Sequence, residues 1–353
     1  MAETMRAAVL YGLRDMRVEN VPMPEIAEPD DVLIRVLSVG ICGSDVHFFT
    51  RGRIGDFILQ QPTIMGHESA GEVVDVGPAV ADLRPGDIVA IEPGKTCRKC
   101  EFCKSGRYNL CPHVVFLAAP PVNGAFCECL VWPRDFVFKL PENLGPDEGA
   151  MMEPLSVGLH AVRLAGVRGG DTVAILGAGP IGLTTLMAAK AHGATRIIVT
   201  DVVAFRLDFA TRLGATNVIN ARETDPVEAI MDLTRGRGVD AAFECAGTEV
   251  TIQQAMKVTR DGGSVQLVGM PAELMPQVPI YDVINRELTV RGTFRYANCY
   301  PAAIALASSG LADVKSLVTH HVDLDSVPEA MAWVEEHKNE VIKAVVHPSE
   351  GSV

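Results

Sequence analysis

The chain has 353 residues, of which 48% are hydrophobic and 21% charged, and its formal net charge is −13. A chain of this length favours more than one hydrophobic core, so we expect two domains. The negative charge would repel nucleic-acid phosphates, and no run of about 18 apolar residues is present to span a membrane. The N-terminus lacks a basic and apolar leader pattern, so the sequence predicts a cytoplasmic protein whose cysteines are reduced or metal-bound.

Short apolar runs separated by Gly, Pro and Asp fill the first part of the chain. Examples are DVLIRVLSVG from Asp31, GEVVDVG from Gly71 and GDIVAIEPG from Gly86. This rhythm is typical of short strands in a β-rich, barrel-like domain. We therefore predict a first domain over residues 1–155.

Chemically reactive side chains are concentrated in three segments. GICGSDVH contains Cys42, Ser44, Asp45 and His47, MGHESAGEVV contains His67 and Glu68, and MMEPLSVGLH contains Glu153 and His160. A thiolate, an imidazole and a carboxylate are typical ligands of a catalytic zinc, which keeps one position open. The sequence thus suggests a site formed by Cys42 and His67 together with Glu68 or Glu153. The alternative is that isolated cysteines and histidines are ordinary core or surface residues, and spacing alone favours that alternative.

A zinc ion at such a site would have a specific chemical use. It would bind an alcohol oxygen and lower its pKa, so that the alkoxide forms near neutral pH. The alkoxide carbon can then release hydride to a nicotinamide cofactor. We expect Ser44 to take the substrate proton and pass it through the cofactor ribose toward His47.

A second cysteine-rich segment, KTCRKCEFCKSGRYNLCP, runs from Lys95 to Pro112 with the spacing C-x2-C-x2-C-x7-C. Its thiols are Cys97, Cys100, Cys103 and Cys111. Four thiolates close a tetrahedron around zinc and leave no open position, so such a site cross-links a lobe with little core of its own. We predict a structural zinc lobe over residues 93–113. A redox-sensing dithiol set and a nucleic-acid-binding zinc knuckle are the alternatives, and the acidic charge disfavours the second.

The pattern changes near residue 155, where apolar runs begin to alternate with helical stretches. The runs cover residues 172–179, 196–201, 216–221, 239–247, 264–270 and 287–294. Continuously apolar strands separated by helices are typical of a parallel sheet covered on both faces. The overall prediction is an α/β protein with a doubly wound nucleotide-binding sheet over 156–294 and a tail, 295–353, that packs back on the first domain.

A glycine-rich turn follows the first of these runs. Gly177, Gly179 and Gly182 form G-x-G-x-x-G between an apolar strand and a helix, which is the pattern that holds a pyrophosphate on a helix N-terminus. Asp201 ends the next strand, where a carboxylate accepts hydrogen bonds from ribose hydroxyls and favours NAD over NADP. Arg206 is a complication, because a guanidinium could hold a 2′-phosphate. Alternatively, Asp201 is a strand-end cap and Arg206 a solvated helix residue.

These segments, together with the stretches FECAG and FRYANCYPAAIALASSG, resemble the zinc-containing medium-chain alcohol dehydrogenases, and within them the sorbitol/xylitol (polyol) dehydrogenase group. The resemblance covers nearly the whole chain. It implies a GroES-like catalytic domain, a Rossmann domain, one catalytic and one structural zinc, and NAD-dependent oxidation of a sugar alcohol to a ketose.

By position, the resemblance assigns the catalytic zinc to Cys42, His67 and a glutamate, which is Glu68 in some relatives and Glu153 in others. The positions that match cofactor contacts are Gly177, Gly179, Pro180, Ile181, Gly182, Asp201, Arg206, Val268, Gly269, Met270, Phe294 and Arg295. The positions expected near substrate are Ser44, Phe48, Glu153, Arg295 and Tyr296. Phe48 departs from the tyrosine of mammalian-type sorbitol dehydrogenases, and the four-cysteine segment is absent from those enzymes.

The assembly and the competing functions complete the sequence-based expectations. The segment PQVPIYDVINRELTVRGTF ends in what should be the outermost strand of the sheet, and an exposed edge invites pairing with a second subunit. The family implies dimers or tetramers, and we expect a homotetramer. The alternatives for function are a threonine-type or other secondary-alcohol zinc dehydrogenase and, more remotely, a non-catalytic NAD-binding protein.

Overall fold

The computed structural model describes residues 3–271 and 277–349, and its chain forms two compact units. The first unit comprises Met1–Glu153, Tyr300–Ser308 and Val314–Val353, and the second comprises Pro154–Cys299 and Ser309–Asp313. The boundaries that we expected from the sequence were residues 155 and 294. In the structure the second unit begins at Pro154, runs to Cys299 and also takes in Ser309–Asp313.

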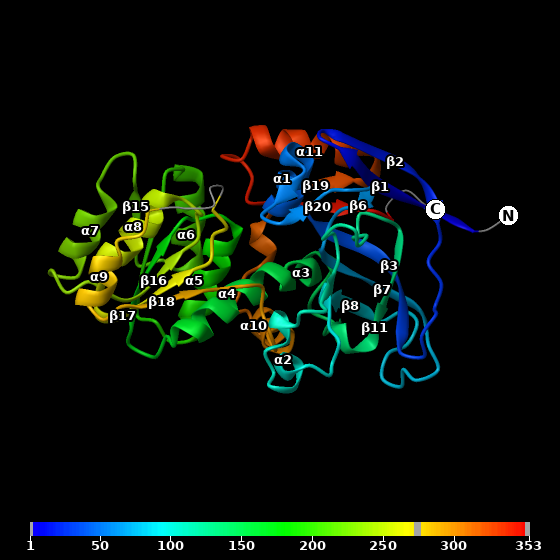
Figure 1. Cartoon of the computed structure of the whole chain (residues 1–353), viewed down its shortest axis with the longest axis horizontal. Helices are drawn as coiled ribbons and strands as arrows, with labels where there is room; N and C mark the ends of the chain where they lie inside the picture. Colours follow the sequence, from blue (N-terminus) through cyan, green and yellow to red (C-terminus); the bar gives the residue numbers. More distant parts are fainter. Residues whose placement is uncertain (1–2, 272–276, 350–353) are drawn as a thin grey trace. The chain divides into compact units, whose positions relative to one another are not determined.

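The first unit contains two main sheets. One has the strand order β2-β1-β6, and the other has the order β12-β8-β7-β3-β20-β19 with β11 also paired to β3 (Figure 1). The strands of this unit are β1 (Thr4–Gly12), β2 (Asp15–Pro22), β3 (Asp31–Gly40), β4 (Arg53–Ile54), β5 (Phe57–Ile58), β6 (Thr63–Ile64), β7 (Glu68–Val76), β8 (Ile88–Ile91), β9 (Gly94–Lys95), β10 (Val115–Phe116), β11 (Cys129–Pro133), β12 (Val137–Lys139), β19 (Val318–Asp323) and β20 (Lys343–His347). Its helices are α1 (Gly43–Arg51), α2 (Glu101–Lys104), α3 (Pro146–Ala150), α10 (Tyr300–Ser308) and α11 (Val327–Glu336).

Strand β20 shows how the end of the chain completes this unit. It pairs antiparallel with β3 and parallel with β19, so the last strands of the chain extend a sheet that the first strands began. All five of its residues are buried, including the polar Lys343 and His347 at its two ends. The core beside it draws on both parts of the chain, including Ile34, Val36, Val39 and Val346.

The second unit is built on one parallel sheet with the strand order β15-β14-β13-β16-β17-β18 (Figure 1). Its strands are β13 (Thr172–Leu176), β14 (Arg196–Asp201), β15 (Asn217–Asn220), β16 (Val239–Glu244), β17 (Thr259–Leu267) and β18 (Thr289–Gly292). Its helices are α4 (Met152–Ala165), which begins at the boundary, α5 (Pro180–Ala191), α6 (Ala204–Leu213), α7 (Pro226–Leu233), α8 (Glu249–Val258) and α9 (Ile280–Asn285). This is the strand order of a doubly wound dinucleotide-binding sheet, so the predicted fold class is confirmed.

The central strands of this sheet are buried almost end to end. In β13 every residue after Thr172 is buried, and in β14 every residue after Arg196 is buried. Two-sided burial explains why these runs are apolar throughout and do not alternate. Strand β17 begins at Thr259, five residues before the predicted run, and Thr259 pairs with Val239 ahead of a register shift to Ser264. Within the described residues, no helix is both long and apolar enough to cross a membrane.

Candidate metal centres and cofactor loop

The loop that carries Cys42 is tied to the loop that carries His67 by one buried carboxylate. Asp45 accepts the backbone N–H of Cys42 at 2.9 Å and the backbone N–H of Gly66 at 3.1 Å. Gly66 has a φ of +87°, and a Cβ there would lie 2.7 Å from the Phe126 ring. Glycine is therefore required at this turn, and the turn brings the next residue, His67, to Asp45.

Three side chains from these loops form the first candidate metal centre. The Cys42 thiol, a His67 ring nitrogen and a Glu68 carboxylate oxygen all lie within 4.8 Å of one another. Cys42 is the N-cap of α1, and Glu68 opens β7 opposite Gly40 of β3. A soft sulfur, an imidazole and a carboxylate are a donor set that suits zinc with one position left open.

The charge balance of this centre favours a cation. Burial disfavours the protonated imidazole of His67, but the Asp45 carboxylate and the Cys42 thiol outweigh burial and raise the pKa of His67 well above its ordinary value. The Asp45 oxygen lies 3.7 Å from His67 Nδ1. The raised pKa favours a proton on His67 when no metal is bound, and a bound cation would compete with that proton.

Lys343 of β20 reaches the same centre from the other end of the chain. Its Nζ contacts both carboxylate oxygens of Glu68, at 2.7 and 2.6 Å, and it also donates to the Ile41 carbonyl at 3.1 Å. Lys343 and Glu68 are almost completely buried, with 3% and 1% of their side chains exposed. Burial lowers the pKa of Lys343, but the Glu68 and Cys42 charges raise it to a net value above the ordinary one.

Two further acids lie in the same unit. Glu153, the second residue of α4, is buried, and its charge acts on both Lys343 and Glu92. Burial is the main cause that raises the pKa of Glu92 to about 7, with a smaller contribution from Glu153, while a hydrogen bond from Tyr108 at 2.8 Å acts in the opposite direction. Glu92 thus titrates near neutral pH, which the sequence did not indicate.

Helix α1 carries the remaining predicted residues of this site. The Ser44 hydroxyl is buried and has no hydrogen-bond partner in the described part of the chain. His47 is half-buried, and burial together with the Arg51 charge lowers its pKa. Phe48 packs in the hydrophobic core, whereas the ring that lies against His67 is Phe116, with 5.6 Å between ring centroids. A role for Phe48 near substrate stays a prediction.

The four-cysteine segment forms the second candidate metal centre, with all four sulfurs within 4.8 Å of one another. The sulfur separations are 3.4 Å for Cys100 and Cys103, 3.5 Å for Cys111 and Cys97, and 3.9 Å for Cys97 and Cys103. A tetrahedral zinc with Zn–S bonds of about 2.3 Å requires separations of about 3.8 Å. Backbone N–H groups, that of Lys99 foremost, lower the pKa of Cys97 to about 6. A backbone hydrogen bond lowers the pKa of Cys100, but burial and the neighbouring sulfurs outweigh it and raise that pKa to about 11, so Cys97 is the thiol that loses its proton more easily.

The predicted cofactor loop has the close backbone contacts that its glycines suggest. Gly177 has a φ of +106°, and a Cβ on Gly182 would lie only 1.8 Å from the Gly177 carbonyl oxygen. Pro180 and Ile181 open α5 directly after Gly179. The turn therefore leaves the first N–H groups of α5 available beside a backbone without side chains, which fits a pyrophosphate.

Asp201 and Arg206 lie beside this loop. One carboxylate oxygen of Asp201 accepts the backbone N–H of Ala178 at 2.7 Å, and the other accepts that of Val203 at 2.9 Å. Asp201 thus shapes the glycine loop and the start of α6, which is the role of a strand-end cap. The Arg206 guanidinium lies 4.0 Å from the position of a Cβ on Gly179.

The other predicted cofactor and substrate positions lie after β17 and β18. The backbone N–H groups of Val268 and Gly269 donate to the Glu244 carbonyl at 2.8 and 2.9 Å, which holds this loop against the end of β16. The Arg295 guanidinium stacks over the Phe294 ring at 4.7 Å. The side chain of Met270 is exposed, and Tyr296 is buried.

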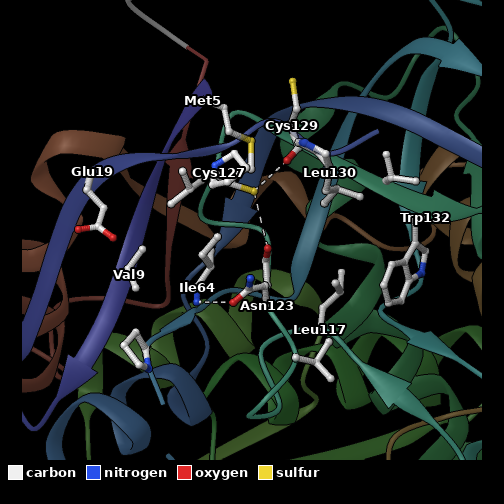
Figure 2. Close-up of a pocket in the computed structure, with 17 residues that line it drawn as sticks. Met5, Val9, Glu19, Ile64, Leu117, Asn123, Cys127, Cys129, Leu130 and Trp132 are labelled. Carbon is white, nitrogen blue, oxygen red and sulfur yellow. Dashed lines mark hydrogen bonds between the residues drawn. The ribbon is translucent and has the colours of Figure 1, made fainter. Parts of the chain in front are cut away.

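A large pocket of the first unit contains none of these residues. Its volume is about 570 Å³, and Figure 2 shows it lined mainly by apolar side chains, including Met5, Val9, Ile64 and Trp132. Glu19 is the charged residue in its wall. Since this wall holds no candidate metal ligand, the pocket is not the site of the chemistry described above.

A parallel dinucleotide-type sheet with a glycine-rich loop, combined with an open zinc-type centre, defines a zinc-dependent oxidoreductase. Comparison with known proteins agrees. A model named "Alcohol dehydrogenase GroES-like domain" matches residues 28–142, and one named "Zinc-binding dehydrogenase" matches residues 180–309. Sorbitol dehydrogenase of Bacillus subtilis is 46% identical over 347 residues, which is 98% of each chain.

Solved structures agree with these matches. An Escherichia coli oxidoreductase/dehydrogenase of unknown specificity has a TM-score of 0.94 and 42% identity, covering 99% of this chain and 100% of its own. A Sinorhizobium meliloti protein described as a zinc-binding dehydrogenase and solved with NADP has a TM-score of 0.89 and 33% identity, covering 98% of this chain and 100% of its own. The chain belongs to the zinc-containing medium-chain alcohol dehydrogenase family, in its polyol dehydrogenase group.

Sequence reasoning missed two residues that the structure brings to the first metal centre. Lys343 contacts Glu68 but carries no motif, and Phe116, which lies against His67, stands in a segment without a signal for this site. Asp45 was visible in GICGSDVH, but its role in joining two loops depends on the distant Gly66. The signal that could have located Lys343 is a lone lysine at the start of an apolar strand.

Proposed function

We propose that this chain reversibly oxidises a sugar alcohol such as sorbitol or xylitol to the ketose, with NAD as hydride acceptor. The observation that carries this proposal is the buried cluster of Cys42, His67 and Glu68 in a chain that is similar over its whole length to a sorbitol dehydrogenase. A hydroxyl-rich, uncharged substrate also suits Arg295, whose guanidinium can donate several hydrogen bonds.

Cys42, His67 and one glutamate would hold the catalytic zinc, which when bound polarises an alcohol oxygen and makes its proton easier to remove. Asp45 fixes the two loops that present the ligands, and Lys343 neutralises part of the carboxylate charge. The unpartnered hydroxyl of Ser44 would accept the substrate proton, and His47 lies one turn further along α1.

We propose Glu68 as the carboxylate ligand, with Glu153 as the acid that orients the substrate. Glu68 supports this assignment because its oxygen lies within 4.8 Å of both the Cys42 sulfur and a His67 nitrogen. The Lys343 contact does not prevent it, since a carboxylate has lone pairs for both partners.

NAD is the proposed cofactor, and the four thiolates of residues 97–111 are the proposed structural zinc site. The buried carboxylate of Asp201 beside the glycine loop supports NAD, because a 2′-phosphate would meet its charge. Arg206 beside Gly179 is the residue that would permit residual use of NADP. The Sinorhizobium meliloti protein, which has a similar fold, was solved with NADP bound.

We propose a cytoplasmic homotetramer. In the described part of the chain, strand β18 ends the sheet of the second unit, and helix α9, which precedes β18 in sequence, exposes Ile280, Tyr281 and Ile284. Apolar residues next to an unpaired edge favour pairing with a second copy. Analytical ultracentrifugation that gives a stable monomer would contradict this proposal.

The experiment that tests the proposed function is a substrate panel with NAD and NADP, run before and after chelation. Sorbitol, xylitol, L-arabinitol, galactitol and L-threonine are the substrates. We expect activity on at least one polyol with NAD, loss of that activity on chelation and recovery with zinc. Activity on L-threonine alone, or polyol oxidation that survives complete zinc removal, would contradict the proposal.

A further inference from the structure

A third cluster of metal-type donors lies in the first unit, formed by residues that no step of the proposed reaction uses. Asp147 of α3, His321 of β19 and His347 of β20 each present one ligand atom within 4.8 Å of the other two. From this geometry we propose that these three side chains bind one divalent cation of the zinc or nickel type, in addition to the two zinc ions proposed above.

The strand register places both histidines on one face of the sheet. In the parallel pairing of β19 with β20, His321 stands opposite Val345 and Asp323 stands opposite His347. Because side chains two residues apart along a strand share a face, His321 and His347 are diagonal neighbours. Their rings stack at 5.1 Å between centroids with an interplanar angle of 22°.

Hydrogen bonds from β3 orient two of the three ligands. His347 Nδ1 lies 3.1 Å from the Leu37 carbonyl oxygen, which can only accept, so Nδ1 carries a proton and Nε2 of the neutral ring carries a lone pair. The Ser38 hydroxyl donates to Asp147 Oδ1 at 2.6 Å. Outer hydrogen bonds of this kind are what fixes the tautomer and orientation of metal ligands.

The distances among the ligand atoms are close to those of a coordination shell. His321 Nδ1 lies 2.9 Å from His347 Nε2, and the two oxygens of Asp147 lie 3.7 Å from His321 Nδ1 and 3.8 Å from His347 Nε2. A tetrahedral zinc with bonds of about 2.1 Å needs ligand separations of about 3.4 Å. The carboxylate contacts are too long for hydrogen bonds, so Asp147 and the histidines face one another across a gap of suitable size.

Metal binding requires only a small change in the most mobile ligand. The His321 side chain is 57% exposed, so it can move by about half an ångström and carry its proton on Nε2, which leaves Nδ1 free to bind the metal. Two imidazoles and one carboxylate favour Zn²⁺, Ni²⁺ or Cu²⁺ over Mg²⁺ and Ca²⁺, which prefer oxygen ligands. Three protein ligands leave at least one position for water. The ion would thus join α3 to β19 and β20.

The test is calorimetric titration of Ni²⁺ into the purified full-length chain and its variants. His321→Asn and Asp147→Asn each remove a ligand at a partly exposed position while they keep the side chain polar. His320→Asn is the matched control, because His320 is the adjacent residue of β19 and its ring packs on Trp333 instead. We expect the wild-type chain and His320→Asn to bind one Ni²⁺ that His321→Asn and Asp147→Asn bind at least tenfold more weakly.

Equal Ni²⁺ stoichiometry and affinity in the wild-type chain and His321→Asn would overturn the proposal, as would the absence of any Ni²⁺ binding by the wild-type chain. In either case the two histidines form only a hydrogen-bonded pair beside Asp147. The Cys42 and four-cysteine centres are unchanged in all four proteins, so their metal content cancels from the comparison.

Discussion

The two proposed zinc centres of the first unit are built in different ways. All four ligands of the thiolate lobe lie between residues 97 and 111, whereas the Cys42 centre combines two loops and is completed by Lys343 from the end of the chain. The lobe can form from its own loop once a metal binds. The Cys42 centre depends on the folded unit, so changes far from it in sequence should alter it.

The largest effect that we expect is the loss of turnover when a ligand of the Cys42 centre is replaced. Cys42→Ser and His67→Ala should each lower kcat by about a thousandfold or more, because a Lewis acid supplies several kcal/mol of transition-state stabilisation. NAD binding, followed by fluorescence titration, should be unchanged. Cys129→Ala is the control for loss of a thiol elsewhere in the same unit, and it should keep kcat within a few fold. Near-normal turnover by either variant would contradict the assignment.

Lys343→Met tests whether Glu68 ligates the metal. In metal-free protein the variant leaves a buried carboxylate without its partner, which should lower the free energy of unfolding by about 3–5 kcal/mol. Zinc should recover part of this loss if it binds Glu68. Thermal unfolding with zinc and after chelation measures both effects.

The control for this variant is Lys139→Met, which removes an exposed pair with Asp87 and should cost no more than about 1 kcal/mol. If zinc stabilises Lys343→Met no more than it stabilises the wild-type chain, Glu68 does not ligate zinc, and the carboxylate ligand is Glu153.

Replacing a cysteine of the thiolate lobe should lower the stability of the first unit and leave kcat nearly unchanged. Cys100→Ser should lower the zinc content by one per chain and destabilise the first unit by about 3 kcal/mol, which corresponds to a Tm shift of roughly 6–12 °C. Below that temperature, kcat per folded chain should stay within a few fold of the wild-type value. Metal analysis and a Tm measurement check the zinc content and the stability. If kcat fell in proportion to the zinc content, the lobe would take part in the reaction.

The difference between the two centres also explains what the sequence could predict. Four cysteines at fixed spacing, three glycines after an apolar strand and six apolar runs are local patterns, and each produced the element or cluster expected. Lys343 and the group of Asp147, His321 and His347 arise from strand pairing between distant segments. Such contacts leave no pattern in a single sequence, since each residue alone has an ordinary role at a strand end or a helix start.

Phe48 is a position whose expected role rests on the resemblance alone. Its side chain is buried in the core of the first unit. Ser44 and Phe48 lie four residues apart in α1 and so share a face of that helix, and the substrate contact of Phe48 stays a prediction.

The smallest effect that we expect is a change in the pH dependence of metal binding at the Cys42 centre when Asp45 is replaced. A proton and a metal compete for the same lone pair of His67, and Asp45 raises the pKa of His67 above its ordinary value near 6.5. In the wild-type chain, metal affinity should therefore rise with pH above 6.5, by up to about tenfold per unit for this proton, until the pH passes the raised pKa of His67. Asp45→Asn removes the charge that favours the imidazolium, so His67 is already neutral above pH 6.5. In this variant the rise of metal affinity with pH should be less steep, by up to the contribution of one proton. Cobalt binding at the Cys42 centre, measured between pH 6 and 8 by its visible absorption with zinc retained in the lobe, gives the slope for each protein. Equal slopes would mean that Asp45 positions the two loops without setting the charge of His67.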